Sequence, residues 1–174
     1  MISERPFQTA KDTDMRINTE TAAEKYRDRL FAAAFHICRN AADADDVVQE
    51  TLLRYHKTDM EYENEEHLKA WLLRVAINQA KNVNRSFFRH RIVPLEDYME
   101  TLSFESQASE DLFLEVMRLP EKYRIVIHLY YYEEYSVREI SQILGITDSN
   151  TKIRLARGRA KLKEKLQEEW DENE

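Results

Sequence analysis

The scarcity of helix-breaking residues constrains the fold of this chain more than any other feature of its sequence. Only two glycines and three prolines occur among its 174 residues. Glycine and proline interrupt helices more strongly than any other residue, so long stretches without them favour continuous helix. No alternating polar and apolar segment bounded by turn residues indicates a strand. The sequence therefore predicts an all-α protein.

Charge is strongly segregated along the chain, although the formal net charge is −7. Residues 40–70 hold nine acids and three bases, whereas residues 69–92 hold six bases and no acid. Residues 152–165 hold seven bases beside one acid, and residues 168–174 hold five acids. Blocks of opposite charge predict several surfaces with different partners.

Composition also divides the chain into segments. Residues 93–110 contain five acids, three serines, a proline and no base, which is typical of a linker. On both sides of this segment, apolar residues recur at helical spacing. The predicted organisation is two small helical domains joined by a linker. The segments are an N-terminal tail (1–20), a first domain (21–92), the linker (93–110), a second domain (111–168) and an acidic tail (169–174).

Several classes of protein are disfavoured by what the sequence lacks. The longest unbroken apolar run covers residues 30–35, which is too short to cross a bilayer. The first 20 residues lack the apolar core of a signal peptide. Cys38 is the single cysteine and lies among apolar residues, so a buried thiol is expected, and His36 beside it lacks the spaced partners of a zinc site. We expect a cytoplasmic protein without stable membrane insertion.

Capping signals near the C-terminus predict a helix-turn-helix. Ser136 and Glu139 have the spacing of a capping box, in which each residue satisfies a free backbone N–H of the other. Gly145 follows the apolar residues of this helix, where a left-handed residue commonly ends a helix. Thr147 then provides an N-cap for the next helix. Helix, glycine turn and helix in this order are typical of DNA-binding proteins.

The second of these helices has two faces. Apolar and small residues recur on one face and are expected to pack inward: Thr151, Leu155, Gly158, Leu162 and Leu166. Bases and amides on the other face can pair with phosphates and with base edges. The alternative is a solvated basic helix that packs on a neighbour. The candidate DNA-contacting residues are Ser149, Asn150, Lys152, Ile153 and Arg157.

Residues 43–55 predict an amphipathic helix with an acidic outer face. Its apolar stripe comprises Ala44, Val47, Val48, Leu52 and Tyr55. The other side carries Asp46, Gln49, Glu50 and Leu53. This side is either a solvated acidic face or a docking surface for a basic partner. A metal site formed by Asp43, Asp45 and Asp46 is a weaker alternative, because no EF-hand spacing accompanies them.

Residues 68–91 predict a second amphipathic helix, with a basic outer face. Leu68, Trp71, Leu72, Val75 and Val83 are expected to face inward. A face of bases and amides with Phe87 and Phe88 nearby suits phosphates and unpaired bases. The alternative is an ordinary amphipathic helix, whose solvent face is usually mixed in charge. The outer residues are Arg74, Asn78, Lys81, Asn82, Arg85 and Arg89.

Three stretches in this order resemble the extracytoplasmic-function group of bacterial RNA polymerase sigma factors. DADDVVQETLLR (43–54) resembles the core-polymerase-binding helix, and AWLLRVAINQAKN (70–82) resembles the helix that melts and reads the −10 element. Residues 119–163 resemble the −35-reading domain. The resemblance implies a factor with no catalytic residues, no cofactor and no metal. Its implied partners are core RNA polymerase, promoter DNA and an anti-sigma protein.

The resemblance also implies roles for individual residues. Asn78 would lie near the pocket for a flipped −10 base, which the acidic loop 61–67 would shape. Thr151 and Gly158 depart from the family pattern, which has an apolar branched residue and an alanine there, and both are expected to loosen or tune the recognition helix. The implied core-polymerase-binding residues are Asp46, Gln49, Glu50 and Leu53; the −10 residues are Arg74, Asn78, Lys81, Asn82 and Arg85; the −35 residues are Ser149, Asn150, Lys152, Ile153, Arg154 and Arg157.

Two other functions compete with this interpretation. A stand-alone helix-turn-helix regulator would leave the acidic helix at 43–55 and the basic helix at 69–91 without a purpose. An enzyme would need a catalytic motif, and the sequence contains no Gly-rich phosphate loop, HExxH pair or nucleophile motif.

Overall fold

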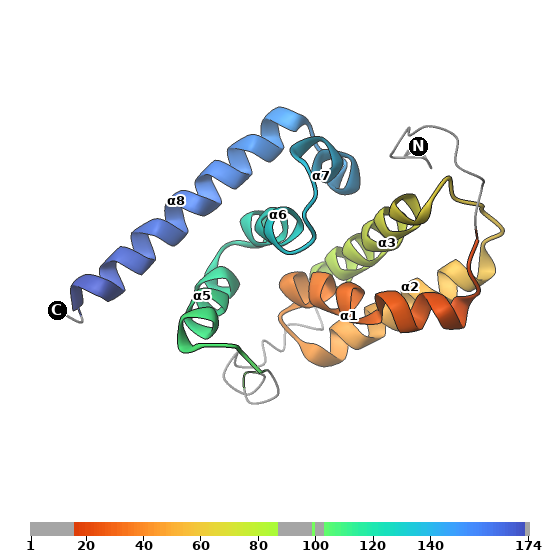
Figure 1. Cartoon of the computed structure of the whole chain (residues 1–174), viewed down its shortest axis with the longest axis horizontal. Helices are drawn as coiled ribbons and strands as arrows, with labels where there is room; N and C mark the ends of the chain where they lie inside the picture. The colour runs from red at the N-terminus through yellow and green to blue at the C-terminus, as the bar shows by residue number, and fades with distance from the viewer. Residues whose placement is uncertain (1–15, 87–98, 100–102, 173–174) are drawn as a thin grey trace.

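The computed structural model describes residues 16–86, 99 and 103–172. The regular structure of these residues is helical, which confirms the predicted all-α class. The helices are α1 (Thr19–Cys38), α2 (Ala41–Lys57), α3 (Glu65–Arg85), α5 (Gln107–Arg118), α6 (Glu121–Tyr131), α7 (Val137–Leu144) and α8 (Asp148–Glu172). Figure 1 shows them as two groups, which we call the N-terminal unit (α1–α3) and the C-terminal unit (α5–α8).

Asparagine caps define the three helices of the N-terminal unit. The side chains of Asn18, Asn40 and Asn64 each accept a hydrogen bond from the backbone N–H three residues later, at 2.8, 3.0 and 2.8 Å. These bonds satisfy N–H groups that have no partner within the helix. Helix α1 ends at Arg39, whose φ of 52° is left-handed. Capping therefore divides this glycine-free segment into separate helices.

Residues before α1 pack on the end of α2. The Arg16 guanidinium donates to the carbonyl of Tyr55 (2.9 Å), and the Tyr55 hydroxyl donates to the carbonyl of Ile17 (2.7 Å). Tyr55 itself is fully buried, like Leu68 and Leu72 of α3. The end of the predicted N-terminal tail (1–20) therefore belongs to the folded unit, since α1 begins at Thr19. Residues 1–15 of that tail lie outside the described residues.

The C-terminal unit is more extensive than the composition suggested. Helix α5 begins at Gln107, inside the segment predicted as a linker, because Ser106 caps it by accepting from the Ser109 N–H at 3.2 Å. Helix α8 continues to Glu172, through most of the predicted acidic tail. Glutamate is a good helix former, and no glycine or proline follows Gly158 to stop the helix. Linker residues 93–98 and 100–102 lie outside the described residues.

The predicted helix-turn-helix is confirmed. The Ser136 hydroxyl accepts from the Glu139 N–H (3.3 Å), and the Glu139 carboxylate accepts from the Ser136 N–H (2.8 Å), which completes the capping box. Gly145 ends α7 with a φ of 65°. The Thr147 hydroxyl accepts from the Asn150 N–H (3.1 Å) at the start of α8. Local chemistry alone thus places the turn between α7 and α8.

Packing explains the two residues of α8 that depart from the family pattern. Thr151 is fully buried, and its hydroxyl donates to the Thr147 carbonyl at 3.1 Å, so its polar group is satisfied in the core. A Cβ at Gly158 would lie 3.2 Å from Cγ1 of Ile127 and 3.4 Å from Cβ of Tyr123. Glycine therefore allows α8 to approach α6 closely. Both residues fit α8 against its neighbours, so the expectation of a loosened helix is not supported.

The two units pack against each other. Helix α6 contacts α1, and α7 contacts α3, while buried apolar residues form one continuous cluster across both units. The sequence predicted two domains joined by a linker and did not predict this contact. Among the described helices, none is both long enough and apolar enough to cross a membrane.

Candidate nucleic-acid and polymerase interfaces

Helix α2 presents the predicted acidic surface. Its apolar stripe is buried, with Val47 and Val48 each 1% exposed, as the sequence predicted. Asp46, Gln49 and Glu50 are exposed on the other side. Leu53 continues that side and keeps 45% of its surface exposed. Carboxylates beside an exposed leucine give this surface both charge and an apolar contact for a partner.

The aspartates considered as metal ligands have other surroundings. Asp45 lies 3.3 Å from the Arg27 guanidinium on α1, and the backbone of Asp43 takes part in the Asn40 cap. Within the described ranges, no three His, Cys, Asp or Glu side chains are grouped so that they could hold a metal ion. Asp46 points outward on the exposed side of α2. The geometry gives the metal alternative no support.

Helix α3 presents the predicted basic face, partly shielded by the C-terminal unit. Asn82 and Arg85 are exposed, whereas Arg74, Asn78 and Lys81 are half-buried. Burial lowers the pKa of Arg74. Burial also lowers the pKa of Lys81, which lies close enough to Glu121 and Arg154 of the C-terminal unit to be affected by both charges. Phe87, Phe88 and Arg89 lie outside the described residues.

The loop expected to shape a base pocket (61–67) is a packed corner in this structure. The Tyr62 ring is fully buried and lies 5.7 Å from the rings of both His67 and Trp71. Burial raises the pKa of the Tyr62 hydroxyl, which is itself buried without a hydrogen-bond partner. The exposed side chains of this corner are the acids Glu61 and Glu66. The aromatic core thus holds the acidic loop against the start of α3.

Helix α8 presents the candidate −35 residues at its N-terminal end. Ser149, Lys152 and Arg157 are exposed, and Ile153 keeps 49% of its surface exposed. An exposed apolar side chain among bases suits contact with a thymine methyl group. Asn150 and Arg154 are half-buried and joined, since Arg154 Nε donates to Asn150 Oδ1 at 3.1 Å. That bond fixes the orientation of both side chains.

A hydroxyl–carboxylate contact sets the angle between the two helices of the motif. The Ser141 hydroxyl on α7 donates to Asp148 at the start of α8, with 2.5 Å between the oxygens. Ser141 is 5% exposed, whereas Asp148 is exposed, so the bond is partly buried. Together with the caps, it holds the exposed face of α8 in a fixed position relative to α7.

An apolar groove lies between α5, α6 and α8, which the sequence did not predict. Its volume is about 900 Å³. Leu112, Tyr131 and Tyr132 at this groove keep 40, 53 and 54% of their surfaces exposed. Leu162 and Leu166, which were predicted to face a core, line it and are half-buried. The spacing of Leu112 and Val116 was the one sequence signal of an apolar face on α5. Periodicity does not reveal whether such a face is covered by another element, so it did not predict an open groove.

Cys38 is half-buried at the end of α1, where its thiol lies 3.9 Å from the Ala80 carbonyl. Burial and the neighbouring Asp43 carboxylate raise the pKa of the thiol to about 12. The thiol is therefore protonated at neutral pH. This agrees with a packed cysteine rather than a nucleophile.

Two family models match the chain in sequence. The model described as "Sigma-70 region 2" matches residues 22–89, and the model described as "Sigma-70, region 4" matches residues 110–162. The chain belongs to the sigma-70 family. The two matched regions correspond closely to the N-terminal and C-terminal units, and both contain the helices that carry the candidate sites.

Curated relatives place the chain in the extracytoplasmic-function (ECF) group of this family. The ECF RNA polymerase sigma factor SigM of Mycobacterium tuberculosis is 28% identical over 126 residues, which cover 71% of this chain and 64% of the relative. SigW of Bacillus subtilis is 25% identical over 160 residues, covering 82% and 86%. The chain therefore spans just under two thirds of the SigM length and most of the SigW length.

Solved structures share the fold. The sigma factor RpoE, crystallised with the anti-sigma factor NepR from Bartonella quintana, has a TM-score of 0.63 and 22% identity, covering 85% of this chain and 96% of that chain. CnrH in complex with the cytosolic domain of CnrY has a TM-score of 0.62 and 24% identity, covering 86% and 87%. At these identities the likeness concerns the fold alone.

Proposed function

We propose that this chain is a sigma factor that binds core RNA polymerase, recognises the −35 and −10 promoter elements and promotes DNA opening. The observation that carries the proposal is that separate helices present three surfaces of different chemistry. These are the acidic surface of α2, the basic and amide face of α3, and the exposed face at the start of α8. They occur in the order in which the two family regions match.

Each surface suits a different partner. The Asp46, Gln49, Glu50 and Leu53 side of α2 offers carboxylates to a basic polymerase surface. Asn82 and Arg85 on α3 are exposed and offer hydrogen bonds and charge to a separated DNA strand. Arg74, Asn78 and Lys81 lie on the same face and complete the candidate −10 set. Flipping a base out costs a few kcal/mol, which contacts of this kind would offset.

The start of α8 is proposed to enter the major groove of the −35 element. A recognition helix contacts base edges with its N-terminal residues, while bases along it contact phosphates. In this helix the amide of Asn150 can pair with adenine, and Lys152 and Arg157 can pair with guanine or phosphate. Seven bases among residues 152–165 provide the charge that binding to DNA requires. The full proposed set is Ser149, Asn150, Lys152, Ile153, Arg154 and Arg157.

The stand-alone regulator is not favoured. Region 2 of the sigma-70 family matches nearly all of the N-terminal unit, which such a regulator would not need. In the present proposal the chain performs no covalent chemistry, because the polymerase makes the RNA. As a polymerase subunit it would act in the cytoplasm.

A third partner is an anti-sigma protein. The structural neighbour from Bartonella quintana was crystallised with one. We propose the apolar groove between α5, α6 and α8 as a binding surface for such a partner, since it leaves Leu112, Tyr131 and Tyr132 exposed. Exposed aromatic and aliphatic side chains in a groove are suited to the apolar face of a helix. Two bases, Arg159 and Lys163, line the groove with one acid, Asp111, and this balance favours a partner helix with acidic flanks.

The experiment that tests the function is run-off transcription with core polymerase on fragmented genomic DNA, followed by mapping of the start sites. We expect a set of starts that depend on this protein and share two upstream elements. Core polymerase without the protein is the control. Promoter binding by the isolated protein, with no co-purification of core polymerase, would instead support the stand-alone regulator.

A further inference from the structure

The segment before α1 is bound to the loop between α2 and α3. We call residues 16–19 the N-terminal strap and residues 58–64 the α2–α3 loop. The Arg16 guanidinium donates to two carbonyls, that of Tyr55 at the end of α2 (2.9 Å) and that of Met60 in the loop (3.2 Å). It also lies 4.6 Å from the centre of the Tyr55 ring. One planar side chain with several donors thus holds both the end of α2 and the start of the loop.

Further bonds fix the strap itself. The Tyr55 hydroxyl donates back to the Ile17 carbonyl (2.7 Å), and the Thr19 hydroxyl lies 3.1 Å from Nδ1 of His56. Asn18, between these two positions, caps α1. A cation at a helix C-terminus also compensates the negative end of the helix dipole, which favours the place of Arg16 at the end of α2. The strap is therefore a fixed part of the N-terminal unit.

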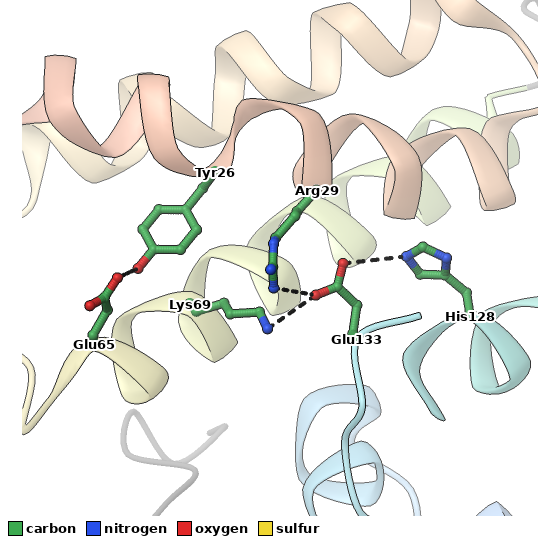
Figure 2. Close-up of polar contacts among 6 residues, drawn as sticks. All are labelled: Tyr26, Arg29, Glu65, Lys69, His128 and Glu133. Carbon is green, nitrogen blue, oxygen red and sulfur yellow. Dashed lines mark hydrogen bonds and ion pairs between the residues drawn. The ribbon is translucent and has the colours of Figure 1, made fainter. Parts of the chain in front are cut away.

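The other end of the loop is anchored by different residues. Asn64 caps α3 by accepting from the His67 N–H (2.8 Å), and the Glu63 N–H donates to Nδ1 of His67 (3.2 Å). Figure 2 shows the Tyr26 hydroxyl of α1 pointing at Glu65, the first residue of α3, to which it donates at 2.7 Å. The loop is thus held at its α3 end by α1 and α3, and at its α2 end by Arg16.

Glu61 lies between these anchors and is exposed. The carbonyl of the preceding residue, Met60, is bound by Arg16, and the following residue, Tyr62, is fully buried. An ionised carboxylate accepts hydrogen bonds and donates none, so Glu61 suits the amino group of a base. DNA phosphates repel the same carboxylate. Glu61 therefore stays beside DNA only as far as the backbone on both sides holds it there.

The α2–α3 loop borders the proposed −10 face of α3. The Tyr62 ring lies 5.7 Å from the ring of Trp71, which is half-buried on α3. Trp71, Arg74 and Asn78 follow one another at steps of three and four residues, so they share one side of the helix. The loop thus packs on the N-terminal end of the row that contains two of the candidate −10 residues.

We propose that Arg16 is a positioning residue for −10 recognition: it fixes the α2–α3 loop so that Glu61 accepts a hydrogen bond from the amino group of an unpaired −10 base. Thymine has no amino group and is disfavoured at that position. The role in promoter recognition rests on the proposed function, whereas the hold of Arg16 on the loop does not. The two parts are therefore tested separately.

The first test measures the loop without polymerase, by hydrogen exchange of backbone amides followed by mass spectrometry. The variants are Arg16→Gln, which removes the guanidinium, and Arg16→Lys, which keeps its charge. The matched control is Arg27→Gln, which removes an exposed guanidinium that lies on α1 and faces Asp45 of α2. Circular dichroism verifies that helix content is unchanged.

Amides of residues 58–63 should exchange about tenfold faster in Arg16→Gln, because two bonds that hold the loop are lost. Arg16→Lys should be intermediate, since an ammonium keeps the charge over the Tyr55 ring without the planar fork. Arg27→Gln should match wild type. Exchange in this segment that is the same in Arg16→Gln and wild type would overturn the proposal.

The second test measures base preference. Core polymerase with each variant transcribes a library of promoters randomised in the −10 element, and sequencing counts the transcripts. At one −10 position, wild type should prefer bases with an amino group over thymine by about tenfold. Arg16→Gln and Glu61→Ala should both reduce this preference. The double variant should lose no more than Glu61→Ala alone, because Arg16 acts through Glu61.

A merely structural role for Arg16 would lower transcript yield from all promoters alike and leave the base preference unchanged. That result, or a wild type that does not discriminate against thymine at any −10 position, would overturn the positioning role. If wild type supports no transcription with core polymerase, the proposed function fails and the positioning role fails with it. The exchange rates would still decide whether Arg16 holds the loop.

Discussion

The N-terminal and C-terminal units use the same type of secondary structure but expose different amounts of apolar surface. The N-terminal unit buries its apolar residues tightly, with Tyr55, Tyr62, Leu68 and Leu72 all fully buried. The C-terminal unit leaves an open apolar groove between α5, α6 and α8. A closed bundle can present rigid polar faces, whereas an open one can also accept an apolar partner. The N-terminal unit thus holds its exposed polar residues in fixed positions. The C-terminal unit does so too, and it also has an apolar groove that a partner can cover.

The largest expected effect tests the rigidity of the N-terminal unit. Leu72→Ala should lower the free energy of unfolding by about 2–5 kcal/mol, because it leaves a cavity in a fully packed core. Chemical denaturation monitored by circular dichroism measures it. Leu53→Ala is the matched control on α2: it should change stability by less than about 0.5 kcal/mol and yet weaken binding to core polymerase. A large loss of stability in Leu53→Ala would contradict the docking assignment.

A pH effect tests the boundary between the units. His36 of α1 and His128 of α6 stack with their ring centres 4.2 Å apart. Burial lowers the pKa of His36 to about 4, and burial together with His36 lowers the pKa of His128. Because His128 is thereby neutral, its Nε2 at 3.9 Å from Glu133 does not form an ion pair. The contact thus brings two neutral histidines together beside the Arg124 cation.

The sign of the pH effect follows from these lowered values. In the unfolded chain a histidine takes up a proton near pH 6.5, whereas the folded contact resists this until about pH 4. The stability present above pH 6.5 is therefore lost as pH falls towards 4, by about 3 kcal/mol for His36. Thermal unfolding between pH 7 and 4.5 measures the loss. The comparison variant is His56→Gln, which removes a histidine from an exposed position.

The next prediction tests whether the exposed face at the start of α8 reads promoter DNA. Arg157→Ala should weaken promoter use by about 1–3 kcal/mol if the residue reads a base. Stability should be unaffected, because the side chain is exposed. Run-off transcription on a mapped promoter measures it, with Lys161→Ala, farther along α8, as the comparison. Unchanged transcription would remove Arg157 from the recognition set.

A companion substitution tests the face of α3. Asn78→Ala should impair promoter opening and leave binding to core polymerase intact, because Asn78 lies on α3 and the docking surface lies on α2. Permanganate footprinting measures opening, and a pull-down with core polymerase measures binding. Loss of core binding instead would show that the −10 assignment is wrong.

The smallest effect separates two roles for glycine within the C-terminal unit. Gly145→Ala should cost about 1 kcal/mol, because the residue has a φ of 65° although nothing lies within 4 Å of an added Cβ. Gly158→Ala gains roughly 1 kcal/mol of helix propensity and loses a similar amount by crowding Ile127. Its net effect should therefore be smaller than that of Gly145→Ala, as denaturation curves of both variants will show.

Local chemistry made much of the fold predictable. The shortage of glycine and proline predicted helices, and Ser136, Glu139, Gly145 and Thr147 predicted the helix-turn-helix. The outward positions of Asp46, Gln49 and Glu50 followed from apolar spacing alone. Capping and periodicity depend on residues within one or two turns of each other, so a sequence displays them directly.

Two helix ends lie inside segments whose composition predicted a linker and a tail. Composition predicted a linker to residue 110 and a tail from residue 169, but serine and glutamate are also ordinary residues at helix ends. Ser106 begins α5 as a cap, and α8 runs through its acidic end. Polar composition alone does not distinguish a linker from a solvated helix terminus.

The sequence by itself determined the helical class, the turn between α7 and α8, and the exposed sides of α2 and of the start of α8. Only the tertiary structure decided what each buried side packs against. It placed Arg29 and Lys69 against one oxygen of the Glu133 carboxylate (Figure 2), Arg124 on the end of α1, and Gly158 against Ile127. These contacts join residues far apart in the chain, and their energies depend on distance and on exclusion of water. Spacing along a sequence encodes neither quantity.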